Sequence, residues 1–130
     1  MLQTHDKINE EYSGRCVDIV PGKRSIVVLK TQDFMKVDES GLVHGGFTFS
    51  AADYAAMAAV NHPHVVLVEA DVKFTAPVRV GDTIVAKAHV YRHVGKRHFV
   101  SVKVLKDEKA VLVGKFICLI LESHVLDSKR

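Results

Sequence analysis

Alternating polar and apolar residues divide most of the chain into strand-like segments. β-branched residues on both sides of a Pro-Gly turn signal at residues 21–24 predict a hairpin with strands over 15–20 and 25–30. Later in the chain, long runs rich in Val, Ile and Phe are separated by short polar turns, and this spacing predicts an antiparallel meander. We expect its four strands over residues 64–77, 83–94, 98–106 and 110–122.

The segment between the hairpin and the meander has the composition of a helix. Residues 46–61 include six Ala, no Pro and one charged residue, Asp53, so their helix propensity is high. Apolar side chains occupy nearly every angle around this helix, which indicates that protein encloses it on most sides. Pro63 disfavours helical geometry in the residue before it and ends the helix.

The strand that follows the helix indicates which face of the sheet is buried. Ala70, Val72 and Phe74 alternate with three charged residues, which is typical of a strand with one face on a core. The Ala-rich helix is the expected partner of that face. The order of elements therefore predicts an α+β domain in which a curved antiparallel sheet wraps one long helix.

Length and composition narrow the class of protein. A chain of 130 residues, 48% hydrophobic and 25% charged, is typical of one folded domain. We expect a polar N-terminal arm over 1–14 and a single domain over 15–130. The net charge is +3 and no run of Lys or Arg exceeds two residues, so we expect no nucleic-acid partner.

Apolar runs, cysteines and histidines in the sequence indicate the compartment of the protein and its metal content. No apolar run approaches the ~20 residues that span a bilayer, and residues 1–12 lack the apolar core of a secretion signal. We expect a cytoplasmic protein without membrane insertion. Cys16 and Cys118 have no paired motif, and we interpret them as buried, reduced thiols. The histidines show no convergent ligand spacing, so we expect no metal.

The order of elements and several motifs resemble the hotdog fold of acyl-CoA thioesterases and related acyl-CoA-binding domains. His44-Gly45-Gly46, followed by Asp53 on the helix, is similar to the signature of the phenylacetate-type branch of that family. The stretch 74–77 with Gly81-Asp82 is also typical of it, and the resemblance covers residues 15–122. It implies a homodimer or larger homo-oligomer whose sheets join, with the acyl-CoA ligand at the interface.

The residues themselves suit thioester hydrolysis. Gly45 and Gly46 open the helix, where free N–H groups and the positive end of the helix dipole form a candidate oxyanion site. Asp53 is the one charged side chain on an apolar helix, and burying an unpaired carboxylate costs several kcal/mol. A plain alternative is that Asp53 lies on an exposed strip or bonds Ser50 or Thr48 locally.

The resemblance assigns roles to these positions. It implies that Asp53 is the general base or the attacking carboxylate, and that His44 has a positioning role more than a proton-transfer role. Two departures put catalytic efficiency in doubt. Several relatives have Asn where this chain has Asp38, and a Ser often found before the strand's Pro is replaced by Ala76, beside Thr75.

The implied substrate contains coenzyme A, so we expect no separate cofactor. Cationic side chains near the ligand would bind the phosphates of coenzyme A. Arg79, Lys96 and Arg97 lie in turns that we place at one end of the meander, and they are the candidate phosphate ligands.

Two other functions stay open. The chain also resembles the effector domain of bacterial malonyl-CoA-sensing repressors of lipid synthesis, which implies a non-catalytic acyl-CoA sensor. In that family an Asn and an Arg occupy the positions of Asp53 and His44, so these two residues favour hydrolysis. Those repressors have DNA-binding helices ahead of this domain, and we expect none in this chain. A hydratase or dehydratase on the same fold is disfavoured, because its usual His/Asp or His/Glu pattern is not evident.

Overall fold

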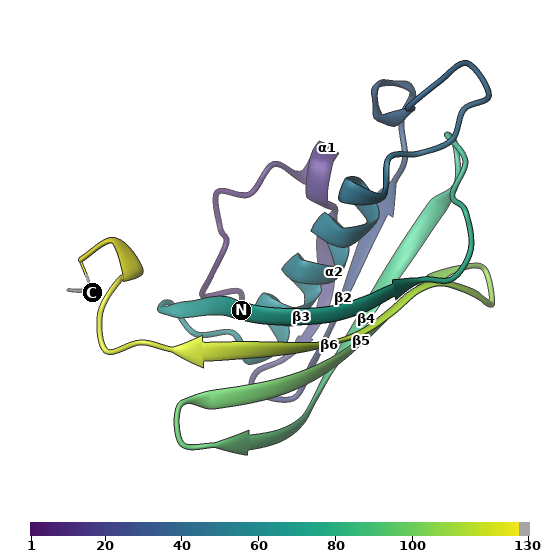
Figure 1. Cartoon of the computed structure of the whole chain (residues 1–130). Coiled ribbons are helices and arrows are strands. Elements are labelled where there is room, and N and C mark those ends of the chain that lie inside the picture. Colours follow the sequence, from purple (N-terminus) through teal and green to yellow (C-terminus); the bar gives the residue numbers. More distant parts are fainter. Residues whose placement is uncertain (128–130) are drawn as a thin grey trace.

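Six antiparallel strands curve around one long helix in the computed structural model, which describes residues 1–127 (Figure 1). The fold class expected from the sequence is confirmed. Short 3-10 turns over Asp33–Met35 and Val125–Asp127 complete the chain. In order, the elements are α1 (Glu10–Ser13), β1 (Arg15–Val20), β2 (Arg24–Lys30), α2 (Gly45–Val60), β3 (Val65–Phe74), β4 (Thr83–Val94), β5 (Arg97–Lys106) and β6 (Lys109–Ile120).

Helix α2 forms the centre of the core. All six of its Ala side chains are completely buried, and their small size lets the backbones of the surrounding strands approach the helix. The helix begins one residue earlier than expected. It ends where Asn61 turns into the left-handed region, at φ 52°, and donates its N–H to the carbonyl of Met57.

The strand order is β1-β2-β4-β5-β6-β3, so the expected four-stranded meander is wrong in one respect. Strand β3 pairs with β6 at the far edge of the sheet, and β4 pairs with β2. Residues 75–82 are long enough to cross the three strand spacings, about 14 Å, that separate β3 from β4. The turn signal at Gly81-Asp82 marks the entry to β4 and not a hairpin. Only β4, β5 and β6 form the meander.

The crossover segment is held by the loop that precedes α2. The N–H of Val43 donates to the carbonyl of Val78 at 2.9 Å, and the N–H of Val80 donates to that of Gly41 at 2.8 Å. Both segments therefore lie side by side at the end of the sheet where α2 begins (Figure 1).

The N-terminal arm packs against α2 on the side away from the sheet (Figure 1). The hydroxyl groups of Ser13 and Ser50 lie 2.6 Å apart, and Leu2 and Ile8 pack against the core. Thr4 is also buried. Because both the arm and the sheet cover α2, the all-round apolar character of this helix is explained.

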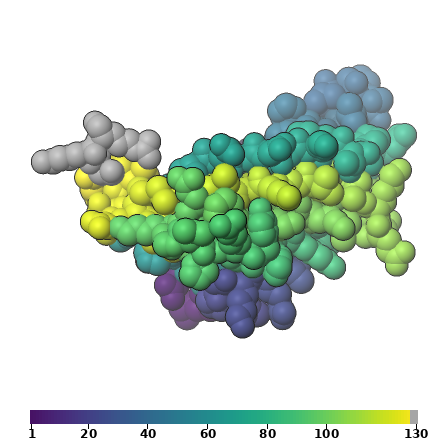
Figure 2. Space-filling view, turned by 60° about the horizontal axis from the view of Figure 1, so that its bottom comes forward, coloured from purple at the N-terminus to yellow at the C-terminus, as the bar shows by residue number. Residues whose placement is uncertain are grey.

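Figure 2 shows the outer face of the sheet, where β3 (teal) lies beside the yellow β6. Exposed charged side chains of β3 lie on this face, as the alternation in this strand predicted. A shallow hollow of about 320 Å³ lies there, and Asp71, Lys73, Lys103 and Lys115 are the charged residues among those that line it. Of the two free thiols, Cys118 is buried as expected, but Cys16 is only half-buried because it lies in the edge strand β1. Within residues 1–127, no helix is long and apolar enough to cross a membrane.

Candidate functional site

The start of α2 presents two backbone donors. His44 is the residue before the helix, its extended backbone turns the chain into the first turn, and its side chain makes no capping hydrogen bond. None of the hydrogen bonds within residues 1–127 uses the N–H of Gly45 or Gly46. These two N–H groups, together with the positive end of the helix dipole, suit a developing oxyanion.

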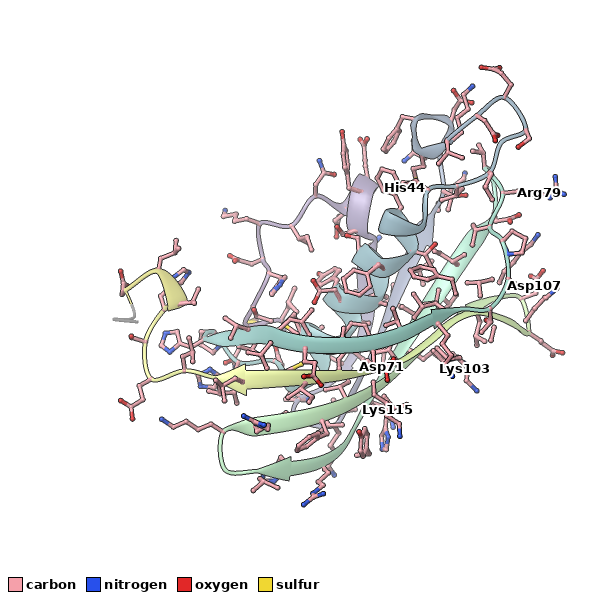
Figure 3. The ribbon with its side chains drawn as sticks, viewed as in Figure 1. His44, Asp71, Arg79, Lys103, Asp107 and Lys115 are labelled. Carbon is pink, nitrogen blue, oxygen red and sulfur yellow. The ribbon has the colours of Figure 1, made fainter. Side chains whose placement is uncertain are left out.

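Side chains lie close to the Cα atoms of both glycines. A Cβ atom on Gly46 would lie 2.9 Å from Nε2 of His44, and one on Gly45 would lie 3.3 Å from the ring of Phe74. The imidazole of His44 therefore folds back over the first turn of α2, with its ring edge-on to Phe47. Figure 3 places His44 and Arg79 at this end of the molecule.

Asp53 lies in the middle of α2, two turns beyond the glycines. Its Oδ1 is buried and has no hydrogen-bond partner within the described residues. The local alternative fails for this oxygen, because the Ser50 hydroxyl pairs with Ser13 and Thr48 does not reach it. Burial raises the pKa of Asp53 to about 6. The carboxylate is thus largely ionised at neutral pH yet remains a better base than an ordinary Asp.

A pocket of about 290 Å³ contains Asp53. It lies beside β3, which is an edge strand, and the first residues of that strand form one wall. The thiol of Cys118 is close by, and its burial, together with the charge of Asp53, raises its pKa to about 12. That thiol is therefore not a nucleophile at neutral pH. Besides Asp53, the pocket is lined by His5, Met57, Val65, Val66, Leu67 and Val125.

The two halves of the candidate site are far apart within one chain. Gly45 and Asp53 are eight residues apart on a regular helix, which corresponds to about 12 Å along its axis. An oxyanion donor and a base must both lie within about 3 Å of one reacting group. One protomer therefore cannot present the N–H groups and the carboxylate to the same thioester.

The candidate phosphate ligands do not gather at one end of the sheet, so that prediction is wrong. Arg79 precedes β4 and Lys96 follows it, and a 12-residue strand, about 40 Å long, separates them. Arg79 lies with His44 at the start of α2, whereas Lys96 and Arg97 lie at the end of the sheet that holds Cys118 and the start of β3. Nζ of Lys96 is 2.9 Å from Oε1 of Glu122 in an exposed ion pair.

The residues that depart from the family pattern lie outside the Asp53 pocket. Asp38 is exposed in the loop before α2, and its hydrogen bonds from the Ser40 hydroxyl and N–H lower its pKa. The Thr75 hydroxyl donates to the carbonyl of Ala110 at 2.8 Å, and Ala76 packs against the core. None of them supplies a polar group to Asp53.

Sequence reasoning missed His5, which the arm carries into the pocket of Asp53. No local motif marks this residue, because only the packing of the arm on α2 brings it there. Among the described residues, no group of three or more His, Cys, Asp or Glu side chains could hold a metal ion.

Comparison with known proteins gives the site its context. The model of the thioesterase superfamily matches residues 40–113. A Pyrococcus horikoshii protein described as uncharacterized is 54% identical, with a TM-score of 0.96 and coverage of 98% of this chain and 97% of that one. A sigma28-regulated virulence protein of Campylobacter jejuni, Cj0977, is 26% identical, with a TM-score of 0.91 and 95% of each chain covered. The PaaI protein of the E. coli phenylacetic acid degradation operon shares the fold at 20% identity, with a TM-score of 0.81 and coverage of 92% and 88%. The expected hotdog fold is confirmed.

Curated relatives are longer than this chain. A transcription factor FapR of Caldanaerobacter subterraneus is 34% identical over 122 residues, which cover 94% of this chain and 61% of that protein. A methylthioribose-1-phosphate isomerase of Aquifex aeolicus is 52% identical over 120 residues, which cover 92% of this chain but 26% of that protein. The similarity thus concerns one part of each of these proteins.

The raised pKa of Asp53 predicts that this side chain destabilises the fold at neutral pH. Because the folded-state value, about 6, exceeds the ordinary 3.8, ionisation lowers stability as pH rises from about 4 to about 6. Asp53→Asn should therefore raise the free energy of unfolding at pH 7.5 by at most about 3 kcal/mol, with little gain at pH 4. Urea denaturation at both pH values measures this difference. Asp71→Asn, on the exposed outer face, is the control, and an equal effect of Asp53→Asn at both pH values would contradict the prediction.

Proposed function

This chain belongs to the thioesterase superfamily, because the model of that family matches more than half of its residues. From that membership we propose that the protein hydrolyses an acyl-CoA thioester to a free acid and coenzyme A. One observation carries it above the others. Among residues 1–127, a buried carboxylate oxygen of Asp53 has no hydrogen-bond partner, and the other walls of its pocket are mostly apolar.

Asp53 suits the role of general base. A carboxylate with a pKa of about 6 is mostly ionised at pH 7 and accepts a proton from water more readily than an exposed Asp does. As that proton moves to Asp53, the water oxygen bonds to the carbonyl carbon. The C–S bond then breaks, and the leaving thiolate takes up the proton. Direct attack by the Asp53 carboxylate, followed by hydrolysis of the resulting anhydride, is the alternative route.

The oxyanion that forms in either route needs donors near the carbonyl oxygen. The N–H groups of Gly45 and Gly46 are suitable, but the helix holds them about 12 Å from Asp53 of the same chain. We therefore propose that two protomers complete the site, with Gly45 and Gly46 of one protomer facing Asp53 of the partner subunit. The position of the Asp53 pocket beside the edge strand β3 supports this arrangement.

Coenzyme A would extend from such a site toward cations. We propose that Lys96 and Arg97 contact its phosphates, because they lie at the end of the sheet that holds the start of β3. Arg79, near His44, is a candidate for the other end of the ligand.

A non-catalytic acyl-CoA sensor is the second candidate function. The 34% identity with FapR over nearly the whole chain favours it. Asp53 and His44 stand against it, because the resembling repressors are expected to have Asn and Arg at these positions. A hydrolysis screen of purified protein against acyl-CoAs from acetyl to palmitoyl separates the two functions, since a sensor binds such ligands without consuming them.

Asp53→Asn should remove nearly all thioesterase turnover and leave acyl-CoA binding close to the parent value, because the amide keeps the size of the side chain and loses the base. In the parent, kcat/KM should rise with pH through about 6, as Asp53 ionises. Steady-state kinetics and calorimetric binding test both statements. Asp71→Asn is the control, and parental turnover in Asp53→Asn would show that Asp53 is not catalytic.

The proposed site also predicts that the protein is at least a homodimer, because one protomer leaves β3 unpaired at the sheet edge and separates the two halves of the site. Light scattering or analytical ultracentrifugation at micromolar concentration measures the mass. A stable monomer under those conditions would count against the shared site.

Neutralising Lys96 and Arg97 together, as Lys96→Gln/Arg97→Gln, should weaken the affinity for CoA esters and flatten its salt dependence, because exposed phosphate contacts are screened over a Debye length of ~8–10 Å. Pantetheine thioesters lack the nucleotide phosphates and should respond little. Lys103→Gln/Lys115→Gln removes the same charge from the outer face of the sheet and serves as the matched control. If the double substitution lowers the affinity for CoA esters and for pantetheine esters equally, this turn shapes the pocket or the dimer instead.

A further inference from the structure

The N-terminal arm brings a second titratable side chain to the pocket of Asp53. His5 lines this pocket, and its ring stacks on that of Tyr54, with the ring centroids 6.1 Å apart and an angle of 20° between the planes. Its backbone adopts the left-handed conformation, with φ 55°. This is uncommon for residues other than Gly. The chain turns here, and the N–H of Ile8 donates to the His5 carbonyl at 3.1 Å.

The arm is fixed next to His5 by partly buried hydrogen bonds. The side-chain oxygen of Asn61 accepts the N–H of Gln3 at 2.6 Å, and the amide of Asn61 donates to the carbonyl of Met1 at 2.8 Å. Thr4 is buried, and its hydroxyl lies 2.7 Å from Nδ1 of His5. The orientation of the imidazole is therefore set by Tyr54 on one side and by Thr4 at one nitrogen.

Within the part of the chain that the structure describes, Nδ1 of His5 has a hydrogen-bond partner and Nε2 has none. Apart from Asp53, His5 is the one polar side chain among the described residues that line the pocket; the others are Met57, three residues of β3 and Val125. A water molecule held in such a pocket needs two or more polar partners. Asp53 supplies one of them, and His5 is placed to supply a second.

We propose that His5 is a positioning residue for the hydrolysis, and that its Nε2 hydrogen-bonds the water that Asp53 activates. This role rests on the proposed function. No Lys or Arg side chain lines the pocket within residues 1–127, and the other titratable neighbours are the Cys118 thiol beside Asp53 and the Tyr54 phenol beside His5. Burial lowers the pKa of His5, which keeps the ring neutral at pH 7 and able to donate or accept a hydrogen bond.

Two substitutions separate this role from simple packing. His5→Phe keeps an aromatic ring on Tyr54 and removes both nitrogens, whereas His5→Gln loses the ring and keeps a hydrogen-bonding end. His89→Gln, on the exposed outer face of β4, is the matched control. The measurements are kcat and KM against pH with a CoA thioester that the parent hydrolyses. Carbon-13 NMR titration of the Asp53 carboxyl in the ligand-free protein is the second measurement, with Asp53→Asn used to assign the signal.

We expect His5→Phe to lower kcat about tenfold to a hundredfold with little change in KM, because a misplaced reactant loses rate and not binding. Loss of the polar imidazole leaves Asp53 in more apolar surroundings, so its pKa should rise in the NMR titration. The acidic limb of the rate profile should move to higher pH by the same amount. His5→Gln should retain more turnover than His5→Phe, and His89→Gln should match the parent.

The role of His5 is overturned if His5→Phe hydrolyses the thioester at the parental rate, with the acidic limb of the rate profile and the titration of Asp53 both unchanged. An equal loss of kcat in both His5 variants, with no movement of the acidic limb, would also overturn it, since the arm would then act through packing alone. If the parent hydrolyses no CoA thioester while Asp53 still responds to His5→Phe, the proposed function fails, and with it the part of His5 in hydrolysis. The two failures therefore remain distinguishable.

Discussion

Burial of most of α2, between the sheet and the N-terminal arm, is the constraint on which the rest of this structure depends. Six fully buried Ala side chains allow the strands to approach the helix backbone closely, and the N-terminal arm covers the side that the sheet leaves open. Water is thereby excluded from most of the helix surface. A carboxyl group in the middle of such a helix loses hydration, and that loss, more than any neighbouring charge, raises the pKa of Asp53.

Stability and reactivity are opposed at this position. A buried carboxylate oxygen without a hydrogen bond destabilises the folded chain once Asp53 is ionised. The same desolvation makes the carboxylate a stronger base at neutral pH. A purely structural role offers no compensation for this cost, whereas proton transfer to a group bound in the pocket makes use of it. This balance is the physical reason for preferring hydrolysis to passive binding.

Helix geometry links the chemistry to assembly. The N–H donors of the first turn and the carboxylate two turns later cannot serve one thioester within a single protomer. An edge strand beside the pocket offers unpaired backbone groups to a second copy. Relatives that include a transcription factor and a much longer isomerase indicate that this domain also occurs as one part of larger proteins.

Local patterns in the sequence determined most of the helices and strands of this protein and the identity of its candidate site residues. Composition marked α2 and Asp53, alternation marked the charged face of β3, and the glycines marked the start of the helix. Strand order was not determined in this way, because residues 75–82 carry a turn signal but also cross to the middle of the sheet. Tertiary structure alone decided that Arg79 lies far from Lys96 and that the arm carries His5 to Asp53. These relations depend on contacts between segments distant in the chain, and no local pattern of residues encodes such contacts.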